Sequence, residues 1–110
     1  MKKEYRIRKN EEFTRIIRKK NSKASRSFIV YSDEKIEGHA RAGISVSKKL
    51  GNAVIRNRIK RQLRMMIHET VNLDMAQRDF IVIVREAYLN GTYDENKKDL
   101  EKAIKNCNII

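Results

Sequence analysis

The chain has 110 residues, of which 26 are Lys or Arg and 14 are Asp or Glu, so its formal net charge is +12. The length predicts a single domain spanning residues 1–110, and no window approaches the roughly 20 consecutive apolar residues of a membrane span. No apolar run follows the basic N-terminus and Cys107 is the only cysteine, which argues against a secretory signal and an internal disulfide, so we expect a soluble cytoplasmic protein.

The N-terminal part predicts an arm followed by a short helix. Residues 1–9 are polar and basic, which is typical of a flexible arm, either solvated or ordered by RNA. Asn10 is a suitable N-cap for the helix that follows it. Three apolar residues then share one helical face, namely Phe13, Ile16 and Ile17.

Two strands are expected next. Residues 27–32 (SFIVYS) are rich in β-branched and aromatic side chains and predict a strand, and residues 33–38 predict a polar turn. Residues 41–47 (RAGISVS) alternate, with Ile44 and Val46 on one side of a second strand. The other side carries only small residues, which leave a sheet face open to a ligand: Gly43, Ser45 and Ser47.

The remaining elements complete an α+β fold. Asn52 is a good N-cap for a long helix over residues 53–70. Residues 80–84 (FIVIV) predict a strand covered on both faces, so strand, helix and strand form a parallel crossover. Thr92 and Glu95 have the spacing of a capping box for a last helix. The expected order is α-β-β-α-β-α, in a two-layer sandwich with one parallel βαβ crossover.

The positive charge is concentrated in the first part of the chain. Residues 1–64 hold 20 basic and 6 acidic residues, a net charge of +14, whereas residues 65–110 hold 6 basic and 8 acidic residues, a net charge of −2. Residues 41–64 contain eight basic residues and no acid, whereas a merely solvated surface normally alternates both signs. This pattern predicts a polyanion as the partner.

The long predicted helix carries much of this charge on one face. Its apolar arc contains Ile55, Ile59, Leu63, Met66 and Thr70. The opposite arc and its flank hold cations and one amide: Arg56, Asn57, Arg58, Lys60, Arg61 and Arg64. An arginine fork pairs two phosphate oxygens at once and also stacks on bases, so this face predicts nucleic-acid binding, with a plain solvated face as the alternative.

A family resemblance rests on this helix. Residues 48–64 read KKLGNAVIRNRIKRQLR and closely resemble the Arg-Asn-Arg motif of the bacterial ribonuclease P protein component. The similarity extends to residues 10–13, 27–31, 43–49 and 79–85, and it is weakest after Arg85. The resemblance implies a ribosomal protein S5 domain 2-like fold with a left-handed crossover, whereas such a crossover is ordinarily right-handed.

The resemblance also implies a function. That family forms the protein subunit of a ribozyme that removes the 5′ leader from precursor tRNA, with the chemistry and Mg²⁺ on the RNA subunit. It implies partners, the RNA subunit and precursor tRNA with its leader, and neither a membrane nor an obligate protein partner. The residues expected to grip the catalytic RNA are Lys48, Lys49, Asn52, Arg56, Asn57, Arg58, Lys60, Arg61 and Arg64.

A second surface resembles the family's cleft for the single-stranded leader. The matching positions are Phe13, Ile17, Tyr31, Ser45 and Ser47. Aromatic side chains stack bases and small residues admit a strand, although Phe13 and Tyr31 would serve equally well as core residues. Ile17 stands where family members often carry an aromatic residue, so one contact there would be apolar rather than stacked.

The sequence offers no catalytic constellation of its own. His39 and His68 lie far apart in the sequence without supporting residues, and no carboxylate pair is placed to hold a metal. We therefore expect no catalytic residue and no metal-binding residue in this chain. The alternatives are a ribosomal or general RNA-binding protein and a self-sufficient ribonuclease. A membrane-surface role is less favoured because the apolar helix face lacks large aromatic residues.

Overall fold

Three helices and four strands account for the fold, and the computed structural model describes all residues from 1 to 110. The helices are α1 (Asn10–Arg18), α2 (Ala53–Thr70) and α3 (Tyr93–Asn106). The strands are β1 (Ser22–Ala24), β2 (Phe28–Glu34), β3 (Ala42–Ser45) and β4 (Arg78–Val84). Short 3₁₀ helices cover Lys3–Tyr5, Lys48–Leu50 and Glu86–Asn90. None of the helices combines the length and the apolar composition needed to cross a bilayer.

The strands form one mixed sheet in the order β1-β2-β4-β3. β2 and β4 are antiparallel, whereas β3 lies parallel to β4. Because α2 connects β3 to β4, the predicted parallel crossover is confirmed. β1 was not predicted, because its three exposed residues (Ser-Lys-Ala) carry no alternating apolar pattern and only their pairing with β2 makes them a strand.

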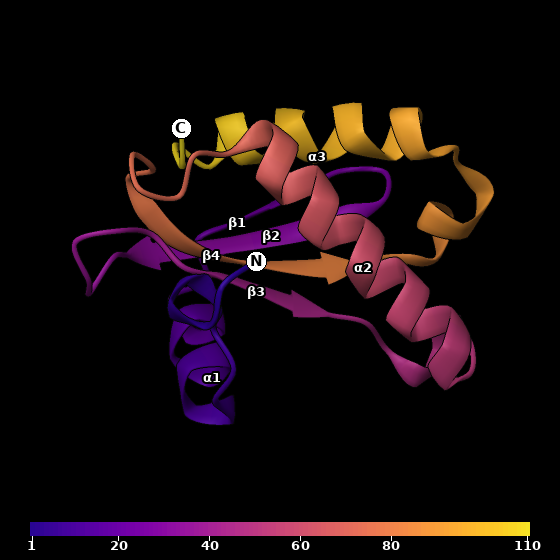
Figure 1. Cartoon of the computed structure of the whole chain (residues 1–110), viewed down its shortest axis with the longest axis horizontal. Helices are drawn as coiled ribbons and strands as arrows, with labels where there is room; N and C mark the ends of the chain where they lie inside the picture. The colour runs from indigo at the N-terminus through magenta and orange to yellow at the C-terminus, as the bar shows by residue number, and fades with distance from the viewer.

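Helices cover both faces of the sheet: α2 and α3 lie on one side and α1 on the other (Figure 1). The side chains of β4 contribute to the apolar clusters on both faces of the sheet. Phe80, Val82 and Val84 belong to the core under α2 and α3, whereas Ile81 and Ile83 belong to the cluster under α1. Successive side chains of a strand point to opposite faces, so the continuous apolar run indeed marks a strand that is covered twice.

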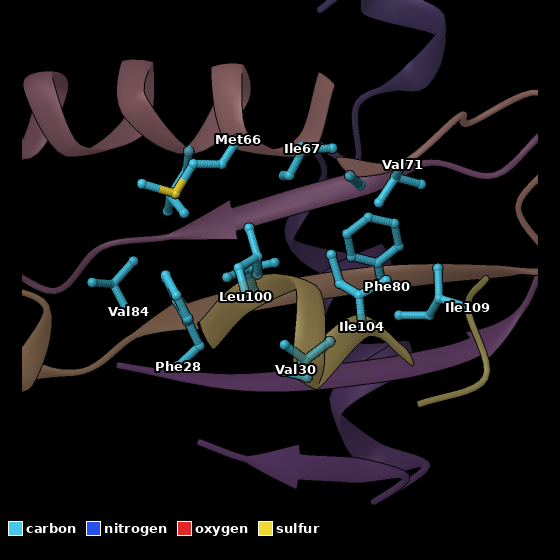
Figure 2. Close-up of a cluster of buried hydrophobic side chains, with 14 of the residues drawn as sticks. Phe28, Val30, Met66, Ile67, Val71, Phe80, Val84, Leu100, Ile104 and Ile109 are labelled. Atoms are coloured by element: carbon cyan, nitrogen blue, oxygen red, sulfur yellow. The ribbon is translucent and has the colours of Figure 1, made fainter. Parts of the chain in front are cut away.

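The larger core lies between the sheet and the pair formed by α2 and α3. The side chains that meet there come from both helices and from β2 and β4 (Figure 2), and include Phe28, Phe80, Met66, Ile67, Leu100 and Ile104. Cys107 also lies in this core, and its Sγ donates a weak hydrogen bond to the carbonyl of Val30 at 3.6 Å. Burial raises the pKa of the Cys107 thiol, which fits a packing role rather than a reactive one.

The N-terminal segment, expected to be a flexible arm, is instead docked along the edge of the sheet. Arg6 forms a parallel bridge with Ala42, and the Ile7 N–H donates to the Ala42 carbonyl at 2.9 Å. Ile7 is only 3% exposed, and the Tyr5 hydroxyl donates to Asp74 at 2.7 Å. Ile7 and Tyr5 stand isolated among polar residues, and Met1 packs against the larger core, so the signal is too short to stand out in the sequence.

Some element boundaries also differ from expectation. The Asn52 side chain caps α2 as predicted, accepting from the Ile55 N–H at 3.0 Å. Asn10 does not cap α1, because Lys9 occupies the cap position and makes no side-chain cap bond. β2 continues through Asp33 and Glu34 into the expected turn, because both residues pair with β4.

The predicted capping box of α3 is present and makes stability depend on pH. The Glu95 carboxylate accepts from the Thr92 N–H at 2.9 Å, and the Thr92 hydroxyl accepts from the Glu95 N–H at 3.2 Å. The backbone and side-chain bonds to Thr92 lower the pKa of Glu95. A lowered carboxyl pKa adds stability at neutral pH that is lost as the pH falls below about 4.3 and through the folded value.

Glu95→Gln should therefore lower the free energy of unfolding at pH 7, and the difference from wild type should shrink toward pH 3. The glutamine keeps an acceptor for the Thr92 N–H but removes the charge. Urea unfolding at several pH values measures the difference. A gap between the two proteins that stays constant with pH would contradict the assignment.

Candidate nucleic-acid interface

Helix α2 is held to the sheet along one side and presents its cations along the other. Ile59, Leu63, Met66 and Ile67 are buried, with Leu63, Met66 and Ile67 fully so. Ile55, expected on the buried arc, is 41% exposed because it lies in the first turn of α2, where the helix extends past the main core. The predicted RNA-gripping residues lie on this helix and the 3₁₀ turn before it, and we call them the basic face: Lys48, Lys49, Asn52, Arg56, Asn57, Arg58, Lys60, Arg61 and Arg64.

The cations of the basic face have no acidic partners. The five ion pairs of the chain join Arg15, Arg41, Lys97 and Lys105 to carboxylates, and none involves a residue between 42 and 64. The Nε atom of Arg56 is buried without a hydrogen-bond partner. Burial and the nearby charge of Arg6 lower the pKa of Arg64. This surface therefore keeps unneutralised positive charge that a polyanion would compensate.

Two residues that were predicted to contact RNA have structural roles. The Asn52 side-chain oxygen is committed to the α2 cap. Ser47, expected in the leader cleft, is exposed just beyond β3, and its hydroxyl accepts from the Lys49 N–H at 3.2 Å. Ser47 thus caps the 3₁₀ turn that carries Lys48 and Lys49, and β3 ends two residues earlier than expected.

A groove lies between α1, β3 and α2, and we call it the α1 groove. Its lining residues come from all three elements and are Asn10, Phe13, Thr14, Ile17, Ile44, Ser45, Val46 and Lys60. Phe13, Ile17 and Ser45 of the predicted cleft are therefore brought together, and Lys60 joins them from the basic face. Tyr31 packs in the same apolar cluster under α1 but does not line the groove.

The face of Gly43, expected to be open, is covered. A Cβ atom on Gly43 would lie 2.8 Å from Cζ of Phe13 and 3.2 Å from Cβ of Ile7. The small residue thus lets α1 and the N-terminal segment approach β3, and the open part of the sheet begins at Ser45. The register places Ile83 beside Ser45 and Ile29 beside Ile83, two half-buried residues that only the strand pairing could identify.

Gly43→Ala should lower the free energy of unfolding by about 1–3 kcal/mol, because the added methyl overpacks against a stiff aromatic ring and a Cβ atom. It should also displace Phe13 and change the α1 groove. Gly38→Ala is the matched control, since nothing lies within 4 Å of a Cβ added there. Thermal melts and urea titrations compare the two, and equal stability of both variants would contradict this packing.

The two histidines lie on different segments, His39 in the loop before β3 and His68 on α2. His39 lies edge-on to Tyr5 with ring centroids 4.7 Å apart, and its Nδ1 is 3.1 Å from the Ala40 carbonyl. His68 is exposed on α2. No group of three or more His, Cys, Asp or Glu side chains is arranged to hold a metal ion.

Comparisons with known proteins agree on one family. The family model described as Ribonuclease P matches residues 1–108. A ribonuclease P protein component of Bacillus mycoides (strain KBAB4) is 48% identical over 101 residues, which cover 91% of this chain and 88% of that protein. A Staphylococcus aureus RNase P protein, solved as a mutant with defective mRNA degradation activity, is 43% identical with a TM-score of 0.88, covering 98% of this chain and 92% of that one. The RNase P protein of Thermotoga maritima has a TM-score of 0.78 at 24% identity, over 92% and 96% of the two chains, which shows a shared fold.

Proposed function

The chain belongs to the ribonuclease P protein family, and from this premise we propose that its basic face binds the RNA subunit and its α1 groove binds the 5′ leader of precursor tRNA. As the protein component of ribonuclease P, the chain is a subunit of the tRNA-processing enzyme and works with an RNA subunit. We propose which residues make each contact, which substrate is bound and where the chemistry takes place.

The absence of acids from the basic face carries the proposal. Its cations make no ion pair, and the carboxylates that do form ion pairs contact cations outside the basic face. Arg56 and Arg64 are half-buried, which limits the positions that their guanidinium groups can take. Phosphates of the RNA subunit would neutralise these groups and release condensed counterions, so binding should weaken steeply with added salt.

The α1 groove suits a single strand. Phe13 offers an aromatic surface for a base, Ile17 an apolar contact, and Ser45 a hydroxyl with little bulk. Lys60 lies at the same groove and supplies a charge for the strand's backbone. Tyr31 supports Phe13 and Ile17 from below through the apolar cluster rather than by lining the groove. We therefore propose that leader contacts and RNA-subunit contacts meet at Lys60.

The chemistry is proposed to lie on the RNA subunit, with Mg²⁺ bound there, and the chain to act in the cytoplasm as one RNA-binding domain over residues 1–110. Within the chain, His39 Nδ1 lies 3.1 Å from the Ala40 carbonyl and its ring contacts Tyr5, and His68 is exposed on α2. The protein's part is to bind and position two RNA molecules.

Reconstitution tests the proposal. The chain is mixed with the cognate RNA subunit, and cleavage of precursor tRNA is measured at physiological Mg²⁺ with long and with trimmed leaders. We expect cleavage to be restored and the affinity for substrate to depend on the leader. If the protein changes neither the rate nor the affinity for leader-bearing substrate, the proposed roles of both surfaces fail.

A second candidate function follows from the Staphylococcus aureus relative, a mutant of which is described as defective in mRNA degradation activity. That Staphylococcus aureus protein is 43% identical over nearly the whole chain, so the same activity is a candidate here. Incubating the purified chain with mRNA, in the absence of the RNA subunit, tests it. Degradation that survives repurification and disappears in one of the variants His39→Ala or His68→Ala would favour a protein-based ribonuclease; intact mRNA would reject it.

A further inference from the structure

A second groove lies at the far end of the basic face, between the N-terminal segment and the C-terminal half of α2 with the loop after it. We call it the N-terminal groove. One wall contains Lys2 and Tyr5, and the other contains Arg64 and His68, with Val71 and Leu73 beyond them. It exists only because the N-terminal segment is docked on the sheet edge through Arg6 and Ile7.

The accessible apolar surface of this groove includes an aromatic ring. Ile67 is fully buried and Val71 is 5% exposed, whereas the half-buried Tyr5 and Leu73 can contact a ligand. The Tyr5 ring is fixed at two points, by its hydrogen bond to Asp74 at 2.7 Å and by its edge-on contact with His39. An accessible aromatic ring that is held in place is what a nucleobase stacks upon.

The rim of the groove has cations that are not neutralised by carboxylates of the protein. Lys2 and Arg64 form no ion pair. The acids of the groove are already engaged: Glu69 accepts from Tyr93 at 2.6 Å and pairs with Lys97 at 3.5 Å, and Asp74 accepts from Tyr5. Nearby, the Nε atom of Arg6 is buried without a partner. The groove therefore combines a surface for a base with charges for a phosphate.

The N-terminal groove is continuous with the basic face. Arg56, Lys60, Arg64 and His68 are spaced four residues apart on α2, so they form one row along the helix. Lys60 lies at the α1 groove, and Arg64 and His68 lie at the N-terminal groove. One row of side chains thus connects both grooves, and an RNA bound along it reaches the N-terminal groove without leaving the protein surface.

We propose that the N-terminal groove binds an unstacked nucleotide of the RNA subunit, with its base on Tyr5 and its phosphate between Lys2 and Arg64. This assignment rests on the proposed RNA-binding role of the basic face and extends it to the N-terminal segment. The leader is left to the α1 groove, which the same row reaches at Lys60.

Variants of the N-terminal segment in the full chain test the assignment. Binding to the RNA subunit is titrated at several salt concentrations. Lys2→Ala should weaken binding several-fold and reduce the slope of log affinity against log salt by about 1. Tyr5→Ala should weaken binding about 5- to 100-fold. Tyr5→Phe keeps the ring and loses only the bond to Asp74, so it should bind nearly as wild type does.

A cross-link identifies the RNA that is contacted. The variant Lys2→Cys is labelled with benzophenone at its introduced thiol. The label reacts selectively at residue 2 because this residue is exposed and Cys107 is buried. Irradiation of the complex should cross-link the RNA subunit at a single-stranded nucleotide, with or without precursor tRNA. A cross-link to precursor tRNA alone would overturn the assignment.

The outcomes separate this inference from the proposed function. If Lys2→Ala and Tyr5→Ala bind with wild-type affinity and salt slope while Arg56→Ala binds weakly, the N-terminal groove is not a nucleotide site and the basic face stands. If the wild-type chain does not bind the RNA subunit at all, the proposed function itself fails. Lys2 is exposed and makes no ion pair, so its variant remains informative even if Tyr5→Ala loses stability.

Discussion

Replacing Arg56 and Arg64 together by alanine is expected to weaken binding of the RNA subunit by about 100-fold, because each lost arginine–phosphate contact costs roughly a factor of ten. The salt dependence should flatten as well, with the slope of log affinity against log salt falling by about 1 for each arginine removed. Neither arginine pairs with an acid or supports the core, so the free energy of unfolding should hardly change.

The matched control is the double variant Lys98→Ala with Lys102→Ala, which removes two cations from exposed positions of α3. It lowers the net charge without touching the basic face, so any loss of affinity that it causes measures the general effect of charge. Filter binding or fluorescence titration at four or more salt concentrations gives both affinity and slope. A double variant whose slope equals that of wild type would show that these arginines do not contact phosphates.

The parts of the fold that the sequence predicted well are those with long periodic signals. The eighteen residues of α2 alternate between buried and charged faces and have a strong cap in Asn52, and the helix begins and ends where expected. β4 has an unbroken apolar run, and both its faces are covered. In each case local pattern and tertiary packing favour the same structure.

The parts that were missed depend on contacts between distant residues. The N-terminal segment is held by Ile7 and Tyr5, whose partners Ala42 and Asp74 lie far along the chain. The covering of Gly43 by Phe13 likewise arises only when α1 folds back on β3. The candidate site was therefore predictable where it follows one helix, and not where two segments meet, as in the N-terminal groove.

The placement of α1 depends on two ion pairs of very different surroundings. Arg15 of α1 pairs with Asp33 of β2 at 2.8 Å, where the two side chains are 33% and 12% exposed. Glu12 pairs with Arg41, which also reaches Asp79 at 3.4 Å. Asp79 is fully buried, and it additionally accepts from the Arg41 N–H at 2.9 Å. The network of Glu12, Arg41 and Asp79 thus joins α1 to β4 through the residue that precedes β3.

Arg41 is the centre of this network. Burial disfavours its charge, but the bond to Glu12 and the charge of Asp79 outweigh that effect and raise the pKa of the guanidinium. Arg41→Met would leave Asp79 buried with a backbone N–H as its remaining partner from this network. Removing one member of a buried pair costs about 3–5 kcal/mol, so we expect the melting temperature to fall by more than about 10 °C.

Leader binding in the α1 groove should weaken together with stability. Phe13 follows Glu12 directly on α1, so a helix released from Arg41 no longer holds its ring in place over Gly43. At a temperature where Arg41→Met is still folded, the advantage of a long leader in substrate affinity should shrink, while affinity for the RNA subunit through the basic face stays near wild type. Arg41→Lys keeps the charge but not the fork, and should lie between the two.

Lys105→Met provides the comparison for a surface pair. Lys105 and Glu101 are 3.2 Å apart on α3 with side chains 62% and 42% exposed, and such pairs contribute less than about 1 kcal/mol. Thermal melts therefore should separate the two variants clearly. If Arg41→Met melts where Lys105→Met does, Asp79 has found other partners and the network does not hold α1. If Arg41→Met melts at a lower temperature but a long leader still raises substrate affinity as in wild type, α1 is positioned by its apolar contacts with Ile81 and not by Arg41.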